Sequence, residues 1–121
     1  MILNSSKSVL SKKVVLIAFL AGISLYGCRR DVVDNVHPAP NQVFLQNIAY
    51  NPASLTVKVN TTVTWINKDD MDHTVTSLTN VFDSGVLHSG LSYSYTFTNT
   101  GTYPYSCQIH GPVMSGTIIV Q

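Results

Sequence analysis

The chain has 121 residues, of which 45% are hydrophobic and 11% charged, and its formal net charge is +1. A chain of this length forms one small domain, and its weak formal charge gives no sign of the basic footprint that nucleic-acid binding needs. All six acidic residues are Asp, and we assign none of them to a catalytic carboxylate pair. No nucleophile triad is evident either, so we expect that the protein is not an enzyme.

Residues 1–27 are predicted to be a lipoprotein-type signal peptide. Three lysines precede an apolar segment, residues 14–25, which is short for a membrane-spanning helix. It leads into Leu25-Tyr26-Gly27-Cys28, which resembles a bacterial lipobox. The alternatives are an ordinary signal cut nearby and an uncleaved anchor helix. We expect an exported, periplasmic protein that lipid on Cys28 anchors to a bacterial membrane.

Residues 28–41 are predicted to be a polar tether, and residues 42–121 to be the folded domain. The tether contains several Asp, Asn and Pro residues, a composition that is typical of a flexible or extended spacer. Cleavage before Cys28 removes three lysines and leaves four Lys or Arg against six Asp, a net charge of 4 − 6 = −2. This mildly acidic mature protein is again unsuited to nucleic acid.

Alternation of apolar and polar residues predicts that the domain is built from strands. Apolar side chains alternate with Thr, Ser or Lys over residues 55–59, 62–65 and 93–98. Turn sequences rich in Asn, Gly and Pro separate these runs. Residues 101–106 and 116–120 add two further strands, and no long helical pattern follows the signal segment. We therefore expect an all-β sandwich or barrel.

The run Cys107-Gln-Ile-His110-Gly-Pro-Val-Met114 carries a thiol, an imidazole and a thioether within eight residues. With a second His, these are the donors of a blue-copper site, in which two His and one Cys bind trigonally and a weak Met lies on the axis. His73, 34 residues before Cys107, is the best candidate for the second imidazole. We expect His73 to begin a strand and residues 108–113 to form a ligand loop.

Two arguments favour copper over the alternatives. Cys107 has no disulfide partner if Cys28 carries lipid, and an unprotected thiol is vulnerable to oxidation in an oxidising compartment. A bound metal would protect it. Zinc is the rival metal, but structural zinc sites with Cys usually hold two or more thiolates. Met114, taken alone, is as readily explained as a core residue. A domain without metal is the remaining alternative.

From about Val43 to Gln121 the chain resembles the cupredoxins, and especially the plastocyanin- and amicyanin-like bacterial ones. The matching segments are Asn51–Val59, Thr64–Asp70, His73–Ser77, Phe82–Gly85, Tyr95–Phe97, Gly101–His110 and Met114–Val120. The resemblance implies a Greek-key β-sandwich with one copper ion near one end. It also implies that His73, Cys107 and His110 are equatorial ligands. Met114 is the implied axial ligand.

Three departures from the family pattern affect the predicted site. Three residues separate His110 from Met114, where the family usually has two or four, so the axial bond length stays open. Asp72 replaces a common Pro, and Thr74 replaces a common Asn that ties the two ligand loops together. Thr74 can still form a hydrogen bond at that place, although with less reach than Asn, and we expect the changes to tune the site without abolishing it.

The residues around the predicted site suggest an apolar surface. Met71 and Leu87 are expected to be exposed near the copper, with Pro112 and Val113 around His110. The resemblance implies that an apolar patch around the second His is the place where electrons enter and leave.

The remaining polar residues near the site are assigned to the surface. His37 and His88 have no clustered partner ligands in the sequence and are expected to be solvated. Asp69, Asp70 and Asp72 are either a solvated turn or a docking surface for a basic redox partner.

These expectations combine into one functional hypothesis and one alternative. The hypothesis is a monomeric carrier of single electrons between an unidentified redox donor and acceptor. The alternative is a copper-binding protein for storage, delivery or resistance. Reversible redox cycling without copper loss separates the two.

Overall fold

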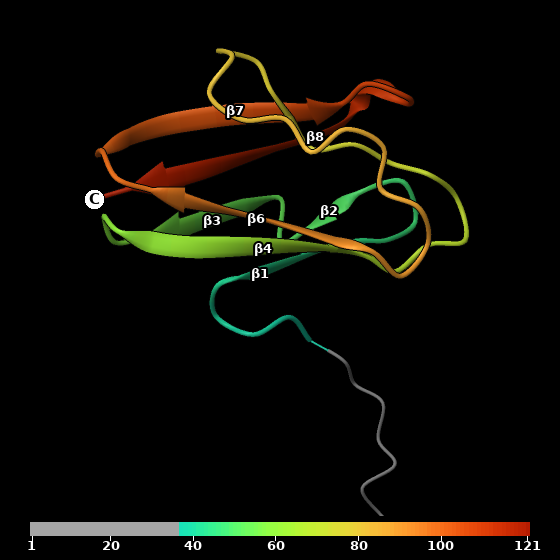
Figure 1. Cartoon of the computed structure of the whole chain (residues 1–121), viewed down its shortest axis with the longest axis horizontal. Coiled ribbons are helices and arrows are strands. Elements are labelled where there is room, and N and C mark those ends of the chain that lie inside the picture. The colour runs from blue at the N-terminus through green and yellow to red at the C-terminus, as the bar shows by residue number, and fades with distance from the viewer. Residues whose placement is uncertain (1–36) are drawn as a thin grey trace, which may run out of the picture. The chain divides into compact units, whose positions relative to one another are not determined.

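The computed structural model describes residues 37–121, which form a sandwich of two four-stranded sheets (Figure 1). The strands are β1 Gln42–Leu45, β2 Tyr50–Asn51, β3 Ser54–Val57, β4 Thr61–Asn67, β5 Thr76–Ser77, β6 Ser92–Phe97, β7 Gly101–Cys107 and β8 Gly111–Val120. Over this range the chain has no helix with the length and apolarity that a membrane crossing needs. The signal peptide and most of the predicted tether lie outside the described residues.

The strands of each sheet are not in chain order. One sheet has the order β2-β1-β4-β6 and the other β3-β8-β7-β5. The pairs β1–β4 and β3–β8 are parallel, whereas β4–β6 and β7–β8 are antiparallel. Parallel neighbours need a crossover connection, and the chain makes its crossovers by passing between the two sheets. This topology confirms the predicted all-β Greek-key sandwich.

The core between the sheets is built by the alternation that the sequence shows. Along β4, Val63 and Trp65 are fully buried while Thr62 is exposed. The Trp65 ring lies at the centre of an aromatic cluster, 5.6 Å from Phe82 and 5.6 Å, edge-on, from Tyr105. Each such pair contributes roughly 0.5–1.5 kcal/mol beyond the area it buries. The core is therefore a rigid support for loops at the ends of the sheets.

The last strand begins earlier than the sequence predicted, at Gly111 instead of at residue 116. The cause is a shift of register in the β7–β8 pair, where Ser106 pairs with Ser115 but Cys107 pairs with Gly111. Residues 112–114 therefore bulge out of the ladder. The expected ligand loop is shorter for this reason, and it starts directly from the hydrogen-bonded end of β7.

His73 does not begin a strand, contrary to the prediction. It makes an isolated antiparallel bridge to Leu87, with N–H to carbonyl distances of 3.1 Å and 2.7 Å in the two directions. The next strand is β5, three residues later. Loop residues around His73 are fixed by this bridge and by side chains, neither of which period-two alternation can indicate.

Candidate metal centre

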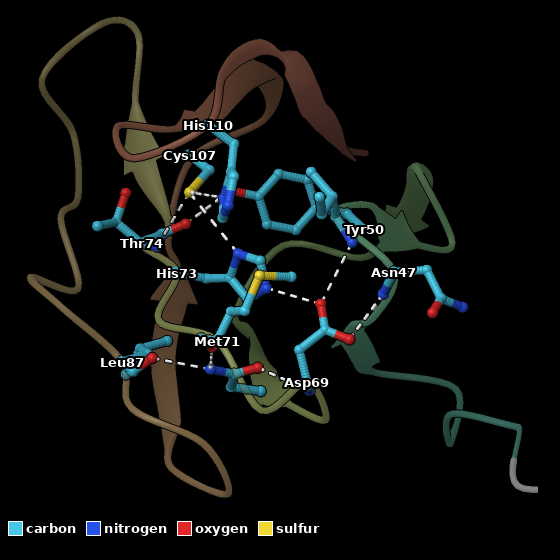
Figure 2. A network of polar contacts seen from close by, with 11 residues as sticks. Asn47, Tyr50, Asp69, Met71, His73, Thr74, Leu87, Cys107 and His110 are labelled. Carbon is cyan, nitrogen blue, oxygen red and sulfur yellow. Dashed lines mark hydrogen bonds and ion pairs between the residues drawn. The ribbon is translucent and has the colours of Figure 1, made fainter.

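Three of the predicted ligands converge at one end of the sandwich (Figure 2). Cys107 closes β7, His110 lies in the turn between β7 and β8, and His73 comes from the bridge to Leu87. The Cys107 Sγ lies 3.9 Å from Nδ1 of His73 and 3.6 Å from Nδ1 of His110. The three donor atoms all lie within 4.8 Å of one another. Within residues 37–121, these are the His, Cys, Asp or Glu side chains that are spaced to hold a metal ion together.

These distances fit one first-row transition-metal ion held by all three donors. Ligand bonds of about 2.0 Å to imidazole nitrogen and 2.3 Å to thiolate sulfur, as at zinc, place trigonally arranged donors about 3.5–4 Å apart. The donor set distinguishes between metals. One thiolate with two imidazoles is typical of copper in a trigonal blue site, whereas tetrahedral sites of two or more thiolates suit zinc. The residues present therefore fit copper.

The site is buried on one side and open on the other. His73 and Cys107 are fully buried, whereas His110 is partly exposed. Burial protects the thiol from bulk oxidants and lowers the local dielectric. Of the three predicted ligands, His110 is consequently the one that reaches the surface.

Thr74 connects the two segments that carry the predicted ligands, so its shorter side chain does have the reach to tie them together. Its hydroxyl accepts a hydrogen bond from the Gln108 N–H at 2.8 Å, and its own N–H points at the Cys107 Sγ at 3.4 Å. On its other side, the Tyr50 hydroxyl donates to the Thr74 carbonyl at 2.7 Å. Burial, and then the nearby Cys107 and Tyr105, raises the pKa of Tyr50, which keeps that hydroxyl a donor. Thr74 thus holds the sulfur in place by backbone and side chain together.

Asp69 was assigned by sequence to a solvated acidic surface, and this is wrong. Its Oδ2 lies 2.8 Å from Nε2 of His73, and only 11% of its side chain is exposed. The backbone N–H groups of Asn47 and Ile48 donate to its two oxygens at 2.8 Å and 3.2 Å. Burial raises the pKa of Asp69, but the hydrogen bonds from Asn47, His73 and Ile48 outweigh it and hold the pKa below its ordinary value.

Asn67 is a second residue that sequence reasoning missed. It is fully buried at the end of β4, and its Nδ2 donates to the carbonyls of Met71 and Leu87, both at 2.8 Å. Its Oδ1 accepts from the Asp69 N–H at 2.9 Å. One amide therefore ties together both sides of the bridge that carries His73. The sequence does hold a signal that could have indicated Asn67, because it is a polar residue on the buried face of an alternating strand, where a polar side chain needs hydrogen-bond partners.

Met114 is fully buried in the same core cluster as Cys107 and lies in the bulge of β8. This position suits a core residue as well as an axial ligand, so its role stays a prediction. Cys28 lies outside the described residues, and its lipidation also stays a prediction.

The other two histidines and the rest of the acidic cluster lie on the surface, as expected. His37 is exposed, and His88 is 68% exposed and pairs with Asp72 at 2.8 Å between Nδ1 and Oδ1. Asp70 is exposed too. Without Asp69, the acidic cluster has two surface carboxylates, one of which is already paired with a histidine.

The predicted apolar surface is present, except for one residue. Met71 is 45% and Val113 80% exposed, and Pro112 is also exposed beside the partly exposed His110. Leu87 is not part of this surface, since it is only 5% exposed. Its backbone bridge to His73 turns its side chain into the core, which the sequence could not indicate.

Comparisons with known proteins agree with the fold and the donor set. Residues 40–121 match the family model of copper-binding proteins of the plastocyanin/azurin family. Amicyanin from Paracoccus denitrificans is 38% identical over 84 residues, which cover 65% of this chain and 63% of amicyanin. Plastocyanin from Scenedesmus fuscus is 35% identical over 91 residues, covering 61% of this chain and 88% of plastocyanin. The matched region is thus less than two thirds of that amicyanin.

Solved structures give the same result. A purple cupredoxin from Nitrosopumilus maritimus superposes with a TM-score of 0.62 at 30% identity, covering 66% of this chain and 98% of the cupredoxin. An oxidised amicyanin variant superposes with a TM-score of 0.64 at 34% identity, covering 72% of this chain and 87% of the variant. With the family match spanning residues 40–121, the chain belongs to the plastocyanin/azurin family of copper-binding proteins.

Proposed function

We propose that the protein carries single electrons at one blue-copper centre. His73, Cys107 and His110 are the equatorial ligands in this proposal, and Met114 is the axial ligand. The observation that carries it is the convergence of one thiol and two imidazole nitrogens within 4.8 Å, on a support that is already hydrogen-bonded. Copper supplies the one-electron change between its cuprous and cupric states.

The chain's own residues hold the donor atoms in place, which limits the structural rearrangement that accompanies the change of oxidation state. Thr74 fixes the Cys107 sulfur, and the bridge to Leu87 fixes the backbone of His73. Donors that cannot move present the same shape to both oxidation states, so little rearrangement accompanies electron transfer. A site preorganised in this way favours a carrier over a delivery protein, which must release its metal.

Electrons enter and leave through His110 in this proposal. Its partly exposed ring lies beside exposed Pro112 and Val113. A redox donor and a redox acceptor dock there in turn, and neither contact needs a catalytic residue of this chain. The protein is therefore not itself an enzyme, and it works as a monomer.

Export and membrane attachment complete the proposal. The signal peptide of residues 1–27 directs the chain out of the cytoplasm, and lipid on Cys28 holds it at a bacterial membrane. Amicyanin and plastocyanin, the relatives found by comparison, support an exported copper protein in general. Labelling with a fatty-acid analogue in a bacterial host tests lipidation, with Cys28→Ala as the control that should lose the label.

The visible spectrum during copper titration tests the carrier role. An intense blue band from thiolate-to-copper charge transfer is expected in the wild-type protein, bleached by reductant and restored by oxidant without copper loss. Cys107→Ser should abolish the band because the sulfur is removed. A colourless protein that binds only cuprous ion would contradict the carrier role and favour storage or delivery. A protein that binds neither ion would contradict copper binding altogether.

A further inference from the structure

The carboxylate of Asp69 lies against the far side of the His73 ring from the metal donors (Figure 2). Nε2 of His73 is 2.8 Å from Asp69 Oδ2, while Nδ1 faces the Cys107 sulfur at 3.9 Å. An ionised carboxylate only accepts hydrogen bonds, so in the neutral ring the proton must be on Nε2. Nδ1 is then left with its lone pair directed at the metal position.

Asp69 does not depend on metal for its own position. The N–H groups of Asn47 and Ile48 donate to its two oxygens, and the Asp69 N–H donates to the buried Asn67 side chain. Asp69 is therefore anchored by its carboxylate to the turn between β1 and β2, and by its backbone N–H to the end of β4. The acceptor that Asp69 offers to His73 therefore has its position fixed by three other groups.

The two imidazoles of the site differ in this respect. Within residues 37–121, His73 has a carboxylate oxygen within 4.0 Å and His110 has none. A carboxylate hydrogen-bonded to the outer nitrogen of a ligating His fixes its tautomer and raises its basicity. His73 is consequently the stronger and the more rigid of the two nitrogen donors.

We propose that Asp69 is a positioning residue that sets the reduction potential of the centre through His73. The cupric ion carries the higher charge and gains more from a basic imidazole than the cuprous ion does. Asp69 therefore stabilises the oxidised state preferentially and lowers the reduction potential. The inference rests on copper binding at this site, but not on the carrier role.

Asp69→Asn is the test, because it removes the charge and keeps an oxygen that can accept from Nε2. We expect cupric affinity to fall about 10- to 100-fold, the usual range for outer-shell partners of metal ligands, with a much smaller loss of cuprous affinity. Each tenfold difference between the two losses raises the potential by about 59 mV. Competition titrations measure both affinities, and voltammetry measures the potential.

Asp70→Asn is the matched control, since Asp70 is exposed and its replacement removes the same charge one residue away. It should leave the copper affinities and the reduction potential close to those of the wild type. Asp69→Glu keeps the carboxylate, so its reduction potential should lie between those of Asp69→Asn and the wild type. Equal shifts in both Asn variants would overturn the proposal in favour of a general charge effect. Equal losses of cupric and cuprous affinity in Asp69→Asn would overturn it in favour of a purely structural role.

The tautomer of His73 gives a readout without copper. In the metal-free protein, ring-nitrogen NMR shifts should place the proton on Nε2 of His73, and Asp69→Leu should lose that preference. A proton on Nδ1 in the wild type would overturn the proposal. Failure of the carrier role would instead appear as a wild-type protein without a blue band, so the two failures are distinguishable.

Discussion

Met114 meets two demands at once, because it fills the core and is also the proposed axial ligand. Its side chain is fully buried in the cluster that contains Cys107. Leu has a similar volume but no sulfur, whereas Ala leaves a cavity. Substitutions at this one residue can therefore separate packing from metal binding.

Met114→Leu is expected to cost the metal-free protein less than about 1.5 kcal/mol of unfolding free energy, and Met114→Ala about 2–5 kcal/mol. If Met114 is the axial ligand, the Leu variant keeps its equatorial donors but its reduction potential rises, because a donor to the cupric ion is lost. Denaturant unfolding and voltammetry measure the two effects. An unchanged potential in Met114→Leu would assign Met114 to the core alone.

At the scale of elements, the pair β7–β8 is packed tightly where it approaches the site. A Cβ added at Gly116 on β8 would lie 2.6 Å from Cζ and from the hydroxyl oxygen of Tyr105 on β7. Tyr105 is fully buried and packs edge-on against Tyr50, with 4.6 Å between ring centroids. The ring therefore has little room to yield to a larger neighbour.

Gly116→Ala is expected to destabilise the metal-free protein by about 1–3 kcal/mol through overpacking. Thermal or urea unfolding measures the loss, and adding Tyr105→Phe should recover part of it, because the close hydroxyl oxygen is removed. A Gly116→Ala protein as stable as the wild type would show that the ring can move aside, contrary to the packing described above.

Strands and loops differ in how far the sequence could predict them. The alternation of Val63 and Trp65 with threonines predicted β4, because one buried face imposes period two. The early start of β8 was not predicted, since a register shift beside Pro112 leaves no alternating pattern. The bridge of His73 to Leu87 was missed because it joins two single residues rather than two strands.

The donor set was predictable for a different reason, which is chemistry at short spacing. Cys107 and His110 are three residues apart, and rare residue types so placed indicate a metal. Asp69 was missed because three carboxylates in one turn look equally solvated in a sequence. Which of them points inward is decided by N–H groups of Asn47 and Ile48, more than twenty residues away in the chain.

For the molecule as a whole, copper held by His73, Cys107 and His110 would join the β4–β5 connection to the β7–β8 turn, and it should then stabilise the fold. Binding to the folded state adds about 2.7 kcal/mol when free ligand is 100-fold above the dissociation constant. For a domain of this size that corresponds to a rise of roughly 10–20 °C in the unfolding midpoint. Calorimetry with and without copper measures the rise, and Cys107→Ser should lose most of it. An equal midpoint with and without copper would contradict the metal centre.

The spacing of the donors along the chain also has a consequence for the unfolded protein. Cys107 and His110 stay close in every conformation because only two residues separate them. His73 lies 34 positions before Cys107, so only folding brings it near. The denatured chain thus keeps a two-donor chelate and competes with the native state for copper. Metal bound to the unfolded ensemble subtracts from the stabilisation of the folded state. The rise of the unfolding midpoint on adding copper will therefore underestimate the affinity of the native centre for its ion.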